Sequence, residues 1–526
     1  MAILNFLTLL TVCSNPGHSL VINTNYTDGK KRKEMRAMIR KIRLVTTTMV
    51  VTTLVAGTGS QLVGQVVVRA DTPTSSISAP SGQGGTPPSG QPGGADTQTY
   101  DYTGTLAASL NVKAGTKQVG AKTLTNTQSD QNVALVQGTG QLTLTGTKLE
   151  KSGAASSDDN ANFYGLDSIL LANGKKAVAT VKNATLTSSA SGANGIFATN
   201  SGTVNVTNTT IKTTGKANSR GLDATYGGKI NANQVKISTS GDHSAALATD
   251  RGGGTVTVKN SHLTTKGSGS PLIYSTGTIT VNKVNGTASG SQIAGMEGYN
   301  QITIVNSRLT SSSDKNSGSD PIKNGVIIYQ STSGDAETSS NKQANFVAKN
   351  SILKTAITSG AMFYVTNTSG KITLENTKLK FASDKVALLN VAGNDSNNWG
   401  TKGQNGGHVT LTLKNQTAQG KIEVDSISSA NVKLTGKTVY TGQTQLTTNK
   451  NATSSSTSKT PLTMSVGTKS KWVVTGNSTV TNLTLARGGK IVDNKGRTVK
   501  IIANGKTVQK GSSPYTVTVT NTFTNK

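Results

Sequence analysis

Residues 256–263 read VTVKNSHL: apolar and polar residues alternate, an asparagine follows at 260, and a leucine comes three positions later. The same phrase returns as VNVTNTTI at 204–211 and as ITLENTKL at 372–379. Alternation with a period of two predicts a β-strand with one buried face. Asparagine tolerates left-handed backbone geometry and bonds nearby backbone groups, so it predicts a sharp corner before a second, shorter strand.

The corner residue recurs at a nearly constant interval. It falls at positions 183, 208, 234, 260, 283, 306, 350, 376 and 415. Only Gln234 and Lys283 replace asparagine there, and most intervals are 23–26 residues. The two longer intervals contain polar insertions at 311–321, 331–343 and 394–407. A repeat of this length is one coil of a β-solenoid, so we predict an all-β, right-handed parallel β-helix with coils of about 23–26 residues.

Each repeat also holds a second apolar run upstream of its corner, as at 195–198 (GIFA), 245–248 (AALA) and 361–365 (AMFYV). We therefore expect at least two strands in each coil and a third after the asparagine. Asparagines on successive coils can bond one another as a ladder. We interpret them as structural corners and not as ligands.

Residues 35–70 have the three parts of a signal peptide. Basic residues cluster at 36–43, a mostly apolar stretch covers 44–56, and small residues at 68 and 70 predict cleavage after Ala70. A transmembrane anchor is the alternative, although glycine and glutamine interrupt the stretch. We expect translation to begin at Met35 or Met38, with residues 1–34 lying upstream of the real protein.

Three further segments are expected in the exported part. Residues 71–103 hold five of the ten prolines and no apolar periodicity, which predicts an extended, flexible linker. Residues 104–440 are expected to form the β-helix. Residues 441–526 are expected to form a looser β-rich cap, since an open end would present unpaired strand edges.

The composition limits the class of protein. Hydrophobic residues make up 33% and aromatic residues 4%, less than in an ordinary α/β enzyme, and Cys13 is the only cysteine. The exported part can therefore form no disulfide, which suits an exported protein of a Gram-positive bacterium. The formal charge is +29, of which residues 1–70 contribute +7. A surface with the remaining +22 attracts polyanions.

The coils that read Val-x-Val-x-Asn-x-x-Leu resemble the right-handed parallel β-helix of the pectin-lyase-like superfamily. They resemble β-helical adhesin-type surface proteins and autotransporter passengers more closely. Segments 290–298, 324–330 and 393–400 are similar to parts of large Gram-positive surface proteins. The resemblance covers about residues 140–440, and it implies an architecture more than an activity.

A carbohydrate-active enzyme, a polysaccharide lyase or glycoside hydrolase, is one alternative that the resemblance implies. Its candidate catalytic residues are Asp167, Asp223, Asp242 and His243. Asp167 and Asp223 end the repeated phrase Gly-Leu-Asp two coils apart, which would separate stacked carboxylates by roughly 10 Å. The triplets of polygalacturonases are missing, and no cysteine or histidine pair suits zinc, so we expect no metal or other cofactor.

Binding candidates lie in one insertion and on three coils. The insertion at 394–407 (NDSNNWGTKGQNGG) places Trp399 among Asn394, Asp395, Asn397 and Asn398. An exposed indole beside amides could stack on a sugar ring, or the loop could fold over its own tryptophan. Tyrosines end apolar runs at three places, as an aromatic edge or as fillers at the core margin: Tyr274, Tyr329 and Tyr364.

We expect several outward lysines to form one cationic face: Lys212, Lys236, Lys259, Lys371 and Lys380. The expected partners are anionic cell-wall polymers or host and environmental glycans, with no specific nucleic acid and no membrane after signal cleavage. The hypothesis is a secreted, monomeric, non-catalytic adhesin or wall-polymer binding protein, held non-covalently at the cell surface. A structural spacer and a threonine-faced ice-binding solenoid are further alternatives.

Overall fold

The computed structural model describes residues 20–24, 50–53, 64–69, 98–336 and 342–526. Two compact units divide the chain at residues 77 and 78. In the first unit, β1 (Leu20–Thr24) and β2 (Val50–Thr53) both pair antiparallel with β3 (Gly64–Arg69). Most of the predicted signal peptide and linker lies outside the described residues. Within the described ranges, none of the helices is both long and apolar enough to span a bilayer.

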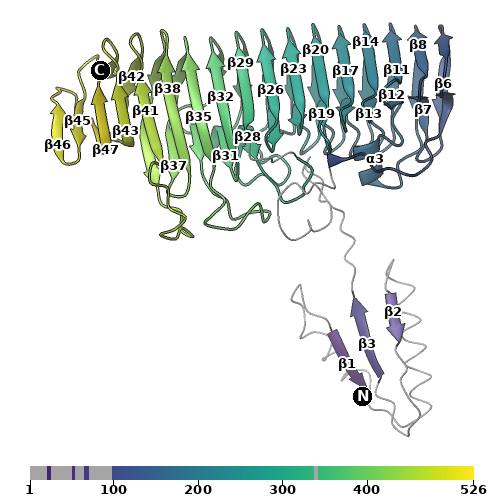
Figure 1. Ribbon diagram of the computed structural model, residues 1–526, viewed down its shortest axis with the longest axis horizontal. Helices are drawn as coiled ribbons and strands as arrows, with labels where there is room; N and C mark the ends of the chain where they lie inside the picture. The colour runs from purple at the N-terminus through teal and green to yellow at the C-terminus, as the bar shows by residue number, and fades with distance from the viewer. Residues whose placement is uncertain (1–19, 25–49, 54–63, 70–97, 337–341) are drawn as a thin grey trace. The chain divides into compact units, whose positions relative to one another are not determined.

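The second unit is a parallel β-helix (Figure 1). A typical coil consists of β13 (Ile196–Thr199), β14 (Thr203–Thr207) and β15 (Thr210–Thr213). Each strand pairs in parallel with its counterpart one coil later, so that Val204 lies beside Ile230. The predicted fold class, the coil length and the third strand are therefore confirmed.

Three long sheets run along the solenoid. Sheet 1 contains β4 (Ala108–Val112), β7 (Asn132–Gln137), β10 (Leu170–Asn173), β13, β16 (Leu222–Ala224), β19 (Leu247–Thr249), β22 (Ile273–Ser275), β25 (Ala294–Glu297), β28 (Asn324–Tyr329), β31 (Ala361–Thr366), β34 (Ala387–Val391), β37 (Ile422–Asp425) and β40 (Thr444–Thr447). Sheet 2 contains β5 (Thr116–Val119), β8 (Gln141–Thr145), β11 (Val178–Lys182), β14, β17 (Lys229–Asn233), β20 (Thr255–Lys259), β23 (Thr278–Asn282), β26 (Gln301–Val305), β29 (Ala344–Lys349), β32 (Ser369–Glu375), β35 (His408–Lys414), β38 (Ser429–Thr435), β41 (Leu462–Val466) and β43 (Ser478–Leu485). Sheet 3 contains β6 (Thr123–Asn126), β9 (Lys148–Lys151), β12 (Thr185–Ser188), β15, β18 (Lys236–Thr239), β21 (His262–Thr265), β24 (Asn285–Ala288), β27 (Arg308–Ser311), β30 (Ile352–Thr355) and β33 (Lys378–Lys380).

The asparagine positions form the corner between sheet 2 and sheet 3, except that Asn415 lies at the corner between sheet 2 and β36 (Thr417–Gln419). Every one of them has a left-handed backbone, with φ between 46° and 56°. Gln234 and Lys283 keep this backbone although they are not asparagine. Asn208 Nδ2 donates a hydrogen bond to Asn183 Oδ1 at 2.8 Å, one coil below. The interpretation of these residues as structural corners is confirmed.

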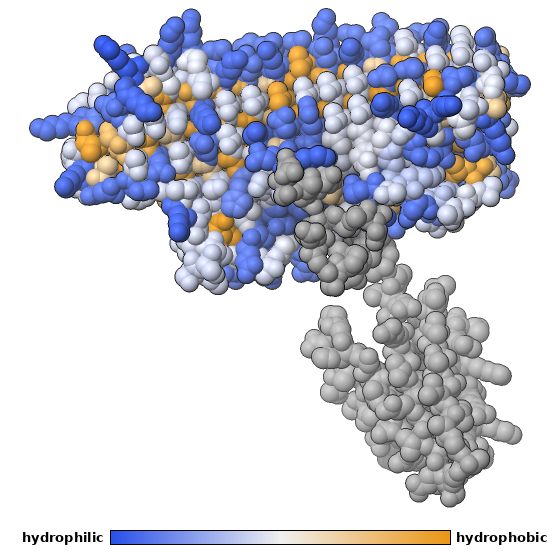
Figure 2. Space-filling model, in the orientation of Figure 1, coloured by the Kyte–Doolittle hydropathy of each residue, from blue (hydrophilic) through white to orange (hydrophobic). Residues whose placement is uncertain are grey.

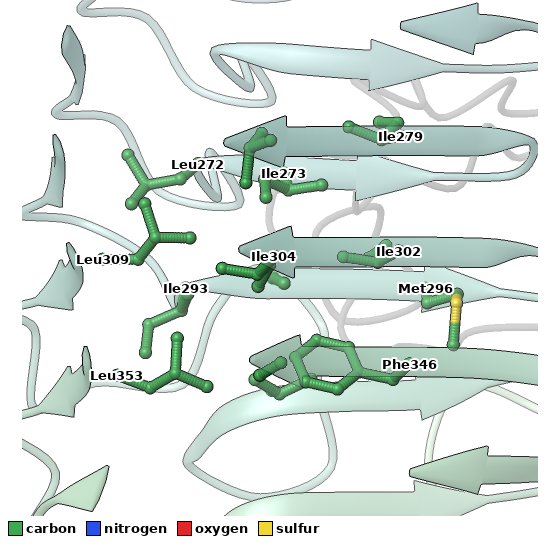
Figure 3. Packing of buried hydrophobic residues seen from close by; sticks show 14 of the residues in the cluster. Leu272, Ile273, Ile279, Ile293, Met296, Ile302, Ile304, Leu309, Phe346 and Leu353 are labelled. Atoms are coloured by element: carbon green, nitrogen blue, oxygen red, sulfur yellow. The ribbon is translucent and has the colours of Figure 1, made fainter. Parts of the chain in front are cut away.

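The core is a narrow column of apolar side chains that stack from coil to coil. Ile279, Ile302 and Phe346 occupy one register position on three successive coils, and Leu309 lies beside Leu353 on the next sheet. All five side chains are fully buried, and Figure 3 shows them packed between facing strands. Each such side chain contributes about 1.5–3 kcal/mol through burial, which explains how a chain poor in aromatic residues folds.

The coils continue beyond residue 440. Sheet 4 takes over from sheet 3 with β36 (Thr417–Gln419), β39 (Val439–Thr441), β42 (Lys471–Val474) and β44 (Lys490–Asp493). The end of sheet 2 is then covered by β45 (Lys500–Ala503), β46 (Lys506–Gln509) and β47 (Thr516–Asn525). β47 pairs in parallel with both β43 and β45, and β46 forms an antiparallel hairpin with β45. The segment expected as a looser cap from 441 thus continues the solenoid and ends in the hairpin of β45 and β46.

A second layer covers part of sheet 1 (Figure 1). It contains α3 (Asp158–Tyr164), which begins at the N-cap Ser157 and ends at Gly165 with a left-handed backbone. The end of the predicted linker also belongs to this layer, because Tyr100 packs edge-to-face on Tyr164 and Tyr226, with ring centroids 5.6 and 5.5 Å apart. Residues 98–103 are therefore packed against the solenoid and are not an extended tether.

Candidate functional site

The outward positions of sheet 1 are buried in its central coils. Leu171, Phe197, Asp223, Ala248 and Tyr274 follow one another in register, and all are fully buried. The chain covers this face with α3, with residues 98–108 and with the insertions that leave sheet 1. The alternation of apolar and polar residues would place this face of sheet 1 in solvent, but in the structure it is buried under a second layer.

A buried ionic cluster lies under this layer. Arg220 contacts Asp223 at 2.7 Å and Asp250 at 2.9 Å, and Arg251 contacts Asp335 at 2.5 Å. Burial raises the pKa of Asp223 and Asp250 in spite of the neighbouring guanidinium of Arg220. The three carboxylates and Arg220 have almost no exposed surface, so the structure gives a substrate no access to them.

Asp167 and Asp223 do not stack. Leu222 pairs with Ile196, which pairs with Leu170, so the residue in register with Leu222 two coils earlier is Leu170 and not Leu166. The first Gly-Leu-Asp phrase therefore lies four positions too early in the chain to stack on the second. Asp167 is instead buried against Lys151, whose Nζ lies 2.8 Å from its Oδ1. The expectation of two carboxylates two coils apart on one face was wrong, because the first phrase begins at Gly165, the C-cap of α3, and ends before β10 begins at Leu170.

Asp242 and His243 form part of a turn. Asp242 Oδ1 accepts a hydrogen bond from the backbone N–H of Ser268 at 2.8 Å, on the next coil. His243 has a left-handed backbone and is buried, which lowers the pKa of its imidazole. Both residues support the stacking of coils at this corner, and the described contacts give neither of them a partner for catalysis.

The insertion at 394–407 folds over its own tryptophan. Trp399 is only 4% exposed, and its ring stacks on Tyr329 with centroids 4.5 Å apart. Asn394 Nδ2 donates to Thr366 Oγ1 at 3.0 Å and also bonds the carbonyl of Trp399. The indole is therefore unavailable for stacking on a sugar, and the second of the two expected arrangements is the one observed.

The other candidates of this insertion have structural partners or lie at its edge. Asp395 pairs with Lys450 at 2.5 Å, Asn397 bonds the carbonyl of Ser319, and Asn398 is exposed. The three tyrosines are buried at the outer margin of sheet 1. Tyr274, Tyr329 and Tyr364 therefore fill space at the margin of the core, which is the second of the two expected arrangements.

The predicted cationic lysines lie on two faces. Lys259 and Lys371 belong to sheet 2, whereas the others belong to sheet 3: Lys212, Lys236 and Lys380. The left-handed corner between the two sheets separates these groups, so they do not form one face.

A groove of about 810 Å³ lies where sheet 1 turns into sheet 2. Short turns at residues 276–277 and 298–300 connect the two sheets here, and Lys342 and Gln343 line the groove just before β29. A Cβ added to Gly277 would lie 2.6 Å from the backbone nitrogen of Gly254, so backbone forms the floor. The lining residues are Gln98, Gly227, Gly252, Gly253, Gly254, Thr255, Thr276, Gly277, Thr278, Tyr299, Asn300, Gln301, Lys342, Gln343, Asn345 and Lys371.

A row of polar side chains crosses this groove. We call it the polar row, and its members are in register on five successive coils: Thr255, Thr278, Gln301, Asn345 and Lys371. Parallel strands lie about 4.8 Å apart, so the row is about 19 Å long. All five are at least partly exposed, and among the residues that the structure describes, none that lines the groove is a carboxylate.

Apart from Lys371, which was expected as an outward cation, the members of the polar row were not predicted from the sequence, although a signal for them exists. Each member lies five residues before a corner position, as Thr255 does before Asn260 and Asn345 before Asn350. The alternation identifies these positions as outward-facing, but only the turn lengths of neighbouring coils place them in a groove. On the side of the solenoid that Figure 2 shows, hydrophilic residues cover much of the described surface, with hydrophobic patches between them.

Neither the protein-family models nor the curated proteins include a match to this chain.

Proposed function

We propose that this protein binds a linear glycan in the groove, without chemical conversion, as a secreted surface adhesin or wall-associated binding protein. The polar row is the observation that carries the proposal. It presents hydroxyls, amides and an ammonium group at a repeating distance, which suits a polymer with repeating hydroxyl or acidic groups. The β-helix architecture shared with adhesins and pectin-lyase-like proteins, and the export signal expected at 35–70, also support it.

The chemistry of the groove favours recognition over catalysis. General acid and base catalysis on a glycosidic bond uses a pair of carboxylates at the bond. The described residues that line the groove include no carboxylate, and the acids Asp250 and Asp335 nearby are buried in ion pairs with arginines. Lys371, at one end of the polar row, adds an attraction for acidic sugars.

The test measures binding of the purified full chain to a panel of neutral and acidic polysaccharides. The variant Asn345→Ala/Lys371→Ala removes two members of the polar row, both with exposed surface. The matched control is Thr180→Ala/Lys182→Ala, which makes the same kind of change on β11, outside the groove. Each lost hydrogen bond costs about 0.5–1.5 kcal/mol, so the groove variant should bind about tenfold more weakly.

Equal loss of affinity in both variants, or no binding to any polymer, would overturn the proposal. Polymer length is followed in the same samples. Shortening by the unaltered chain that disappears in Asp223→Asn would replace the proposal with an enzyme.

A further inference from the structure

The positive charge of this protein is concentrated in its last coils. Residues 437–526 contain thirteen Lys or Arg and one Asp, a net charge of +12, whereas the 366 residues from 71 to 436 carry +10. The single acid, Asp493, is buried and bonds Arg497 at 2.7 Å. No side-chain carboxylate is therefore exposed over these 90 residues, all of which the structure describes.

Five of these cations gather along one corner, which we call the basic corner. It is the corner at which sheet 2 turns into sheet 4 in three successive coils, and its members are Lys437, Lys469, Lys471, Arg487 and Lys490. Lys471 and Lys490 are direct register partners on neighbouring strands. Lys437 and Lys469 each lie two positions before the register partners Val439 and Lys471.

Stacking of coils brings these charges close together. Neighbouring strands lie about 4.8 Å apart, which is less than the Debye length of about 8 Å at physiological ionic strength. All five side chains are exposed, and none forms an ion pair with another described residue. Like charges held this close repel one another, and a bound polyanion relieves that repulsion.

The described strands that adjoin the basic corner offer no exposed aromatic ring on which a nucleobase or a sugar ring could stack. The aromatic residues of the adjoining strands, Tyr440 and Trp472, are fully buried and face the core. Stacking on aromatic rings is a main source of affinity for single-stranded nucleic acids. Four of the five cations are lysines, which act as point charges and need no planar acceptor. A flexible chain of charges without rings fits these features best.

We propose that the basic corner binds a linear polyol phosphate of the cell wall, and that it holds the protein there independently of the groove. This inference does not rest on glycan binding, since the groove lining and the basic corner share no residue. Strongly hydrophilic side chains project from the C-terminal end of the solenoid in Figure 2, as a surface for such a polymer requires.

The test uses the full chain and polyglycerol phosphate, with neutral dextran and double-stranded DNA as further probes, over a range of salt concentrations. Lys469→Gln/Lys471→Gln/Lys490→Gln removes three charges from the corner. The matched control, Lys212→Gln/Lys236→Gln/Lys266→Gln, removes three exposed charges from the part of the solenoid that carries sheet 3. Exposed glutamines preserve the fold, which circular dichroism and thermal unfolding verify.

The corner variant should bind polyglycerol phosphate at least tenfold more weakly at low salt, with a flatter dependence of log Kd on log salt, because fewer counterions are released. The control and the groove variant Asn345→Ala/Lys371→Ala should retain the affinity of the unaltered chain. Equal losses in the corner variant and the control would overturn the proposal, because net charge alone would then explain binding. Tighter binding of DNA than of polyglycerol phosphate would also overturn it.

Discussion

Arg251 Nε lies 2.5 Å from Asp335 Oδ1, although 84 positions of sequence separate the two residues. Arg251 belongs to the turn whose glycines form the groove floor, and Asp335 belongs to the connection between β28 and β29, from which Lys342 and Gln343 line the groove. Ser331 and Ser333 of the same insertion donate hydrogen bonds to the buried carboxylate of Glu297. The first part of this connection, residues 331–336, is therefore attached to the solenoid through buried polar groups.

The first prediction concerns this attachment. Arg251→Met leaves Asp335 buried without its cation, and removal of one partner of a buried pair costs about 3–5 kcal/mol. We expect faster amide hydrogen exchange at residues 331–336 and weaker glycan binding. The control is Lys323→Met, which breaks the exposed pair with Asp314 and should cost far less, because exposed ion pairs contribute little to stability. Similar exchange in both variants would contradict the role given to Arg251.

The second prediction concerns pH. Asp320 is buried and accepts hydrogen bonds from Asn324 at 2.8 Å and Gln292 at 3.2 Å, and burial raises its pKa to about 7. The folded state therefore binds a proton more tightly than the unfolded state, whose pKa is about 3.9. The free energy of unfolding must fall as pH rises from about 4 to about 7, by an amount on the order of 4 kcal/mol.

Asp320→Asn keeps the neutral shape and removes this dependence. The difference in the free energy of unfolding between this variant and the unaltered chain should be near zero at pH 4. The variant should become the more stable of the two as the pH rises to 7. Thermal unfolding midpoints of the two proteins, measured side by side over this range, test the sign. Midpoints that differ by a constant amount at every pH would show that the pKa of Asp320 is the same in the folded and unfolded states, which would contradict this prediction.

The third prediction concerns the corner. Asn208 has φ of 47°, and a non-glycine residue without a compensating side chain loses about 1–2 kcal/mol in this backbone region. Asn208→Ala also removes the hydrogen bond to Asn183, so we expect a loss of about 2 kcal/mol in stability. Asn208→Gly should cost less, since glycine adopts this backbone freely. Chemical unfolding measures the free energy of unfolding of the two variants. A much smaller loss in Asn208→Gly than in Asn208→Ala would make backbone strain the main cause, whereas equal losses would make it the asparagine ladder.

The fourth prediction concerns Trp399. Its indole is buried against Tyr329, so Trp399→Phe should leave polymer binding unchanged, whereas Trp399→Ala should destabilise residues 394–407 by about 3–5 kcal/mol. Hydrogen exchange of this segment measures the second effect. If Trp399→Phe lost polymer binding while hydrogen exchange of the segment stayed normal, the indole would have to contact the polymer, which would contradict this prediction.

The repeat was predictable because its causes are local. The alternation in each strand sets which face is buried, and residues such as Asn260 and Asn376 have left-handed backbones wherever the spacing places them. The site was not predictable in the same way. Asp223 and Tyr274 look outward-facing by alternation, but α3 and the insertions cover them. Asp167 looked like a partner of Asp223, but α3 shifts its phrase by four positions.

The sequence by itself determined the coil, its length and its corners, because a period of two and an asparagine every 23–26 residues act within a single turn of the chain. Only the tertiary structure decided which outward side chains meet solvent. Which side chains meet solvent depends on the lengths of the turns in neighbouring coils. Trp399 and Asp335 lie buried in long connections, whereas the polar row stays accessible beside short turns. The basic corner has the same origin, since stacking places Lys471 beside Lys490 from positions 19 residues apart.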